Sequence, residues 1–240
     1  MSDLFVPLND YPAYRQIANL IEQRIVGRSL RTGDALPSET DLARQFGVNR
    51  STVREAIREL EIQGLLGRGR GEKRLRVTRP EHHHISGGIS RALALHDVSI
   101  RDVWEGLIVL EPPIAEAAAK CRQQADLATL EATVADAMDP DTDAAARQAA
   151  GFFRHVGEAS HNRVLMLAHE PLLQLLAPSL RRMIDQVEAA RARIATAQRR
   201  ILAAVRDGDV AAARSWTEKH IRDYRRGFEL AGIDLTDRVD

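Results

Sequence analysis

The chain has 240 residues, of which 44% are apolar and 28% charged, a composition that supports two packed domains and excludes global disorder. The single cysteine, Cys121, excludes an intrachain disulfide and suits a reducing compartment. The N-terminus lacks a basic segment followed by an apolar run, and no stretch approaches the ~18 uncharged apolar residues of a membrane span. We therefore expect a cytoplasmic protein that does not cross a membrane.

Positive charge gathers in the N-terminal third of the chain, although the net charge is zero. Residues 1–80 carry 14 Lys and Arg against 10 Asp and Glu, and within them residues 49–79 carry nine against four. The remaining 160 residues carry 20 against 24. A basic cluster of this kind is typical of a surface that meets phosphate groups, so nucleic acid is the expected partner of this part.

The same third predicts three helices and a β hairpin. Apolar residues at helical spacing indicate helices at about 14–27, 38–46 and 50–63, of which the last two are joined by a turn at Gly47. Ser38 is expected to cap the second helix. After the third helix, two short apolar segments flank a stretch with three glycines and four basic residues, which predicts a two-stranded hairpin with a basic tip.

This order of elements is that of a winged helix-turn-helix, a mainly α domain whose hairpin is called the wing. In such domains the N-terminal end of the last helix enters the major groove of double-stranded DNA. Arginine there matches the O6 and N7 atoms of guanine, while hydroxyl groups and a glycine-rich basic wing suit phosphate. The alternative is a basic, solvated helix, and the ordered combination favours DNA binding over it. The candidate residues are Asn49, Arg50, Ser51, Thr52, Arg54, Arg68, Arg70 and Gly71.

Two segments make the resemblance to a known family specific. The chain reads GDALPSE at 33–39 and FGVNRSTVREAI at 46–57, and over roughly 14–79 it resembles the GntR family of bacterial transcription regulators. In the FadR-like branch of that family, DNA is met by the wing tip, by two arginines matching Arg50 and Arg54, and by an arginine that directly follows the P-S/A-E motif. The resemblance therefore adds Ser38 and Thr40, and Thr40 in place of arginine predicts one lost or weakened contact.

The rest of the chain reads as helix, without the alternation typical of strands. After a DNA-binding domain at 1–79 we expect a linker at 80–88, an all-α bundle of six to seven helices at 89–232, and a tail at 233–240. Proline inside a helix removes a hydrogen bond and clashes with the preceding turn. Helix breaks are therefore expected at Pro112-Pro113, Pro171 and Pro178, besides polar and glycine-containing positions.

This part resembles the FCD-type effector domain of the same branch over about 89–228. The likeness lies in the order of Leu110-Glu111-Pro112, the alanine-rich run at 115–119, and His155 followed seven residues later by Asn162. The resemblance implies a divalent metal of the zinc or nickel type, held by an aspartate and three histidines. The matching positions here are Gly151, His155, Gln198 and His220. Only His155 and His220 keep ligand-type side chains, so we expect no metal and no other cofactor.

The resemblance also implies a pocket for a small-molecule effector, with candidates Leu107, Glu111, His155, Gln198 and His220. Leu107 stands where the family has an arginine that usually holds a carboxylate. Because Leu107, Gly151 and Gln198 replace polar anchors, we expect an effector more apolar than a small carboxylate. The alternative is that His155 and His220 are core histidines with hydrogen-bond partners, and the sequence favours neither reading.

Together these features predict a ligand-responsive regulator of transcription, and in the resembled family repression is the commoner outcome. Two recognition helices must meet two half-sites, so we expect a homodimer on a near-palindromic operator. An enzyme is the first rival, because His155, Glu158 and His161 lie close in sequence. The chain has no nucleophile elbow, P-loop or H-E-x-x-H motif, and we expect no catalysis. The second rival is an architectural DNA-binding protein without an effector, which would need no pocket.

Overall fold

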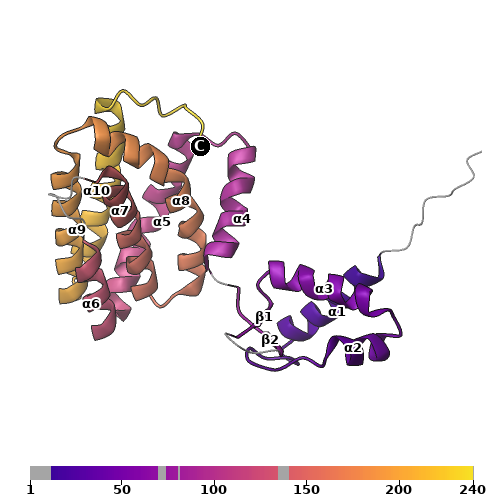
Figure 1. Ribbon diagram of the computed structural model, residues 1–240. Helices are drawn as coiled ribbons and strands as arrows, with labels where there is room; N and C mark the ends of the chain where they lie inside the picture. Colours follow the sequence, from indigo (N-terminus) through magenta and orange to yellow (C-terminus); the bar gives the residue numbers. More distant parts are fainter. Residues whose placement is uncertain (1–11, 70–73, 81, 135–140, 240) are drawn as a thin grey trace, which may run out of the picture. The chain divides into compact units, whose positions relative to one another are not determined.

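The computed structural model describes residues 12–69, 74–80, 82–134 and 141–239, which form ten helices and two strands (Figure 1). The chain divides into two compact units, Met1–His84 and Ile85–Asp240. The described part is mainly helical, with its two strands in the N-terminal unit, so the predicted fold class is confirmed.

The N-terminal unit is a winged helix-turn-helix. Its elements are α1 (Ala13–Val26), α2 (Glu39–Phe46), α3 (Arg50–Ile62), β1 (Leu66–Arg68) and β2 (Leu75–Val77). The strands pair antiparallel, with Leu66 opposite Val77. Buried apolar side chains from all five elements meet in one core, among them Ile21, Leu42, Ile57, Leu66 and Val77. These are the positions that the helical and strand periodicities select.

Two residues set the geometry of the helix-turn-helix pair. The Ser38 hydroxyl accepts a hydrogen bond from the backbone N–H of Asp41 at 3.1 Å and so begins α2. Gly47 ends α2 with φ of +66°, a conformation that side chains with a Cβ rarely adopt. The chain therefore turns sharply at Gly47 and presents the start of α3 at the surface.

The C-terminal unit is a helical bundle. Its described helices are α4 (His82–Leu95), α5 (Ile100–Cys121), α6 (Gln124–Thr133), α7 (Thr142–Ala159), α8 (Arg163–Gln186), α9 (Ala190–Asp207) and α10 (Val210–Leu230). The long helix α5 packs against α7, α8, α9 and α10, which places it at the centre of the bundle (Figure 1). Seven helices agree with the predicted six to seven.

The segment expected as a linker, 80–88, is helical from His82 onward, because α4 begins there. Gly87 and Gly88 lower its helix propensity, but serines on the same helix tie it to α8. The buried Ser90 hydroxyl lies 3.0 Å from Oε1 of Gln174, and Nε2 of Gln174 donates to the Ser86 hydroxyl at 2.6 Å. Tertiary contacts therefore outweigh the local preference for a coil.

The predicted helix breaks at the prolines are wrong. Pro112-Pro113 lie inside α5, and Pro171 and Pro178 lie inside α8. A proline in a helix interior costs about 3 kcal/mol. Residues of the same helices near the prolines, including Ile114 and Leu176, are buried in the bundle core. The burial of these apolar side chains stabilises each helix and offsets the cost of its prolines.

The segment after α10 is not a free tail. Ile233, Leu235 and Val239 are buried in the same core, and the backbone N–H of Ile100 donates to the carbonyl of Asp237 at 2.9 Å. The described end of the chain therefore belongs to the C-terminal unit. Within the described ranges, the helices are too short or too polar for any of them to cross a lipid bilayer.

Candidate DNA interface and effector region

A hollow of about 780 Å³ lies in the N-terminal unit, where the starts of α2 and α3 meet the wing strands. Four arginines, from α3, β1 and the segment before β2, line it together with the residues that open α2. Its polar lining is Ser38, Glu39, Thr40, Asp41, Arg50, Arg54, Arg68 and Arg74. The fold thus brings the candidates of three separate segments to one surface, and it adds Arg74, which the sequence analysis did not select.

Glu39 holds two of these arginines. Its Oε2 accepts from Nη2 of Arg54 at 3.1 Å and lies 3.8 Å from Nη2 of Arg50. The side chains of Arg50 and Arg54 remain 60% and 59% exposed, respectively, so their charges stay accessible to a polyanion. The sequence assigned Glu39 only to the first turn of α2, and no local signal links it to Arg54, fifteen residues away.

The remaining DNA candidates lie near the same surface. Asn49 is the N-cap residue of α3 but makes no capping hydrogen bond, and Ser51 is exposed beside it. Thr52 is partly exposed, and Arg68 pairs with Glu61 at 2.7 Å. The start of a helix with nearby hydroxyl groups is suited to phosphate. Arg70 and Gly71 lie outside the described residues.

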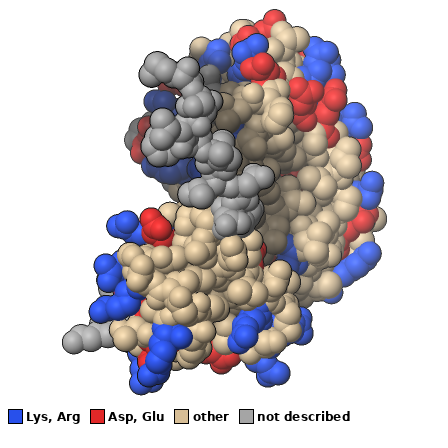
Figure 2. All heavy atoms as spheres, turned by 90° about the vertical axis from the view of Figure 1, so that its right-hand side faces the viewer, with Lys and Arg blue, Asp and Glu red and all other residues tan. Residues whose placement is uncertain are grey.

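The charge distribution differs between the two units. In Figure 2, several Lys and Arg side chains stand around the margin of the N-terminal unit, in the lower part of the view, with few Asp and Glu among them. On the visible face of the C-terminal unit both signs are interspersed. A surplus of positive charge on the first unit is the electrostatic pattern of a phosphate-binding surface.

Four of the five effector candidates are buried in the C-terminal unit. Leu107 and Glu111 lie one turn apart on α5 and are fully buried. Gln198 of α9 is also fully buried, and its Nε2 donates to the carbonyl of Ala149 at 3.3 Å. His155 differs, because it is partly exposed and its Nδ1 lies 2.8 Å from Oε2 of Glu158 on the same helix.

Glu111 has a buried partner that no sequence pattern indicates. Its Oε1 lies 2.8 Å from Nδ1 of His169 on α8, and both side chains are fully buried. The other polar atoms of the pair, Oε2 of Glu111 and Nε2 of His169, have no partner among the described residues. A Cβ at position 157 would lie 2.5 Å from Nε2 of His169, so the histidine requires Gly157. No sequence pattern links residues 58 positions apart.

His220, the fifth candidate, is buried among aromatic rings. Its Nε2 lies 3.0 Å from the Tyr224 hydroxyl, and its ring stacks on Phe153 with centroids 5.6 Å apart. Burial lowers the pKa of His220 from 6.5 to about 3, so the imidazole is neutral at pH 7. Burial also raises the pKa of Tyr224, and the negative charge of Glu111 adds to this effect.

Of the four positions that would hold a metal in the resembled domain, only two carry ligand-type side chains here, His155 and His220. Gly151 offers no ligand atom, and Gln198 turns its amide nitrogen to a carbonyl. His155 pairs with Glu158, whereas His220 is held by Tyr224. A metal site needs several converging N, O or S ligands. The described residues contain no group of three or more His, Cys, Asp or Glu arranged to hold an ion.

Comparisons with known proteins agree with this architecture. Residues 13–73 match the family described as bacterial regulatory proteins, gntR family, and residues 102–223 match the FCD domain. The HTH-type transcriptional regulator LutR of Bacillus subtilis is 30% identical over 154 residues, covering 63% of this chain and 70% of LutR. The HTH-type transcriptional repressor NanR of Edwardsiella tarda is 32% identical over 161 residues, covering 65% of this chain and 62% of NanR.

Among solved structures, a GntR protein of Streptococcus agalactiae superimposes with a TM-score of 0.56 at 24% identity, over 89% of this chain and 99% of that one. This likeness supports the fold. The chain belongs to the GntR family of transcriptional regulators and carries an FCD domain. Members of this family are DNA-binding regulators and not enzymes, so the predicted family and the predicted absence of catalysis are confirmed.

Proposed function

We propose that the chain is a ligand-responsive repressor that binds a near-palindromic operator as a homodimer and releases it when an effector binds the C-terminal unit. The observation that carries the DNA-binding part is the hollow in which Arg50, Arg54, Arg68 and Arg74 converge. A surface with four arginines and a helix start is built for the phosphates and base edges of a duplex.

Each side chain has a role in this proposal. Arg50 and Arg54, at the start of α3, reach base edges in the major groove, where the guanidinium fork matches guanine. Asn49, Ser51 and Thr52 flank them, and the wing contacts the adjacent backbone. Ser38 and Thr40, with Arg68, Arg70 and Gly71 of the wing, complete the proposed interface.

Dimerisation follows from the DNA. One recognition helix covers only a half-site, and half-sites lie about 34 Å apart along the duplex. Two copies related by a twofold axis therefore match a near-palindromic operator. NanR, named as a repressor, supports repression as the regulatory outcome.

The effector acts by linkage. A ligand that binds one arrangement of the C-terminal unit more tightly shifts the DNA-competent population, typically by about 1–3 kcal/mol. The helix α4, which follows the DNA-binding unit in the chain, is tied to α8 through Ser86, Ser90 and Gln174, and this supports α4 as the segment that responds. The buried Leu107 supports an effector that is more apolar than a small carboxylate.

Fluorescence anisotropy with DNA from upstream of the chain's own gene tests the proposal. We expect tight binding that survives physiological salt and fails on a scrambled duplex. Arg50→Ala with Arg54→Ala should weaken specific binding by about a hundredfold, because a bidentate base contact is worth about 1–3 kcal/mol. Arg24→Ala, which removes an exposed arginine of α1 outside the hollow, is the matched control.

Light scattering of the free and DNA-bound protein measures the number of copies. Equal binding to native and scrambled duplexes that disappears with salt would contradict the proposal and favour an architectural DNA-binding protein. If a monomer bound the native duplex with full affinity, the proposed homodimer would be wrong.

A further inference from the structure

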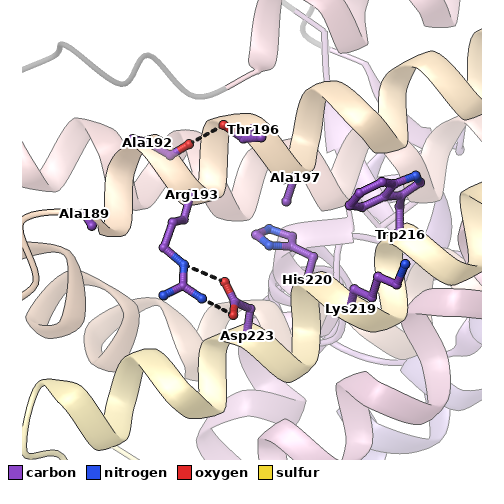
Figure 3. A pocket seen from close by; sticks show the side chains of 9 residues that line it. All are labelled: Ala189, Ala192, Arg193, Thr196, Ala197, Trp216, Lys219, His220 and Asp223. Atoms are coloured by element: carbon purple, nitrogen blue, oxygen red, sulfur yellow. Dashed lines mark hydrogen bonds and ion pairs between the residues drawn. The ribbon is translucent and has the colours of Figure 1, made fainter.

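A groove of about 440 Å³ opens between α9 and α10 on the outside of the C-terminal bundle (Figure 3). Its walls are apolar, formed by Ala192 and Ala197 of α9 and by the indole of Trp216 of α10. Alanine at these positions leaves the space that a larger side chain would fill. The volume lies within the ~300–1,000 Å³ typical of sites for small organic molecules.

Positive charge stands beside this apolar surface. Nζ of Lys219 lies 4.8 Å from the centroid of the Trp216 ring, and the guanidinium carbon of Arg200 lies 5.6 Å from the same centroid. Neither cation forms an ion pair with a carboxylate of the described residues. Asp223, the acidic group of the groove, is neutralised by Arg193, whose Nε donates to it at 3.0 Å. The groove therefore keeps a surplus of positive charge.

One buried polar side chain reaches the groove. Figure 3 shows the imidazole of His220 projecting between Arg193 and Ala197. The hydroxyl of Tyr224 contacts Nε2 of His220. The other ring nitrogen, Nδ1, has no hydrogen-bond partner among the described residues and is not completely buried. That nitrogen is thus available to a molecule in the groove. Burial keeps the ring neutral at pH 7, so it offers a hydrogen bond and no charge.

We propose that this groove is the effector site and that its ligand is an organic monocarboxylate with a flat aromatic body, an inference that rests on the proposed effector-dependent function. The aromatic body lies against Trp216 and the alanines, the carboxylate meets Lys219, and His220 contacts the ligand from the floor. Among the five effector candidates, His220 is the one that lines the groove. Through Tyr224 and Phe153 it also contacts the core, so occupancy of the groove is transmitted inward.

Isothermal titration of the full chain with 1-naphthylacetate tests this assignment, with 1-naphthylacetamide as the uncharged ligand of the same shape. We expect one site per chain, and binding of the amide at least about tenfold weaker, because it loses the charge-assisted contact. Lys219→Gln should weaken naphthylacetate binding by about the same factor. Ala197→Leu, which fills the groove and leaves the lysine in place, should abolish it.

Arg222→Gln is the matched control, because Arg222 is a cation on the same helix that pairs with Glu218 and does not line the groove. Its affinity for naphthylacetate should equal that of the wild type. Equal binding of acid and amide, unchanged binding in Lys219→Gln, or no binding at millimolar ligand would overturn the inference. Conversion of a dimer to a monomer by Ala197→Leu would also overturn it, because the groove would then be an interface between copies.

Operator binding by the same proteins separates the two proposals. Specific operator binding in a protein that does not bind naphthylacetate would reject the groove and leave the repressor function standing. Lys219-dependent binding of naphthylacetate without specific operator binding would reject the function and leave the groove standing. If both hold, naphthylacetate should shift operator affinity in the wild type and not in Ala197→Leu.

Discussion

The DNA-binding surface of the first unit and the core of the second hold ionisable side chains in opposite surroundings. Arg50 and Arg54 of the N-terminal unit are more than half exposed, whereas Glu111 and His169 of the C-terminal unit are fully buried. An exposed cation retains its hydration and can exchange water for a phosphate, with little consequence for folding. A buried pair has lost its hydration, and its partners depend on each other. Substitutions should therefore change DNA affinity at the arginines of the hollow and stability at the buried pair.

The largest effect that this comparison predicts is at Glu111. Glu111→Leu leaves His169 buried without its partner and should lower the free energy of unfolding of the C-terminal unit by about 3 kcal/mol. Urea unfolding followed by tryptophan fluorescence reports on this unit alone, because the two tryptophans of the chain, Trp104 and Trp216, lie in it.

Two controls sharpen this measurement. Glu105→Leu changes an exposed glutamate of the same helix and should alter stability by less than about 0.5 kcal/mol. The double variant Glu111→Leu, His169→Leu should recover part of the loss, since no unpaired polar group remains. A loss below about 1 kcal/mol in Glu111→Leu would show that the pair is not the buried, coupled unit described above.

A second, smaller effect concerns acid. The pKa of His220 is about 3 in the folded chain and 6.5 as an ordinary histidine, so the unfolded state binds more protons between these values. Stability is therefore lost as the pH falls below about 6.5, by about 2 kcal/mol at pH 5. In His220→Asn the difference in unfolding free energy between pH 7.5 and pH 5 should shrink by this amount. An unchanged difference would mean that other groups cause the acid sensitivity.

The smallest effect is expected at Glu39, in the exposed site. Glu39→Gln releases Arg54 and Arg50 and removes one negative charge from the hollow. Non-specific DNA binding should then strengthen by a few fold, while the ratio of native to scrambled affinity falls by a few fold because the arginines are less well ordered. Stability should change by less than about 1 kcal/mol, as for other exposed pairs. Anisotropy at two salt concentrations measures both affinities, and an increased ratio would contradict the expectation.

The difference between the units also explains which predictions held. In the N-terminal unit the helix starts, the turn at Gly47 and the wing are encoded by neighbouring residues, and their bounds were predicted to within one or two positions. In the C-terminal unit the local signals of the prolines misled. Pro112-Pro113 and Pro178 were read as breaks, and the helical residues 82–88 as coil, because the packing that holds these helices involves residues far along the chain.

The candidate sites divide in the same way. The hollow unites Arg50, Arg54 and Arg68, all selected from the sequence, since a motif of short spacing determines where they lie. The contacts by which Glu39 holds Arg54 and Arg50 in place were not predicted. Of the effector candidates, His220 was chosen by resemblance, but its contact with Tyr224 and its place in the groove come from the packing of helices against one another.

By itself, the sequence determined the winged helix-turn-helix, the helical nature of the second unit and the family, because periodicity, capping and short motifs act between residues a few positions apart. Only the tertiary structure decided that Glu111 pairs with His169, that α5 and α8 continue through their prolines, and that Lys219 and Trp216 face a groove. Such facts depend on which helix faces meet. The helix faces that meet are those whose packing buries the core as a whole, because each contact contributes little to the free energy of folding until many others have formed.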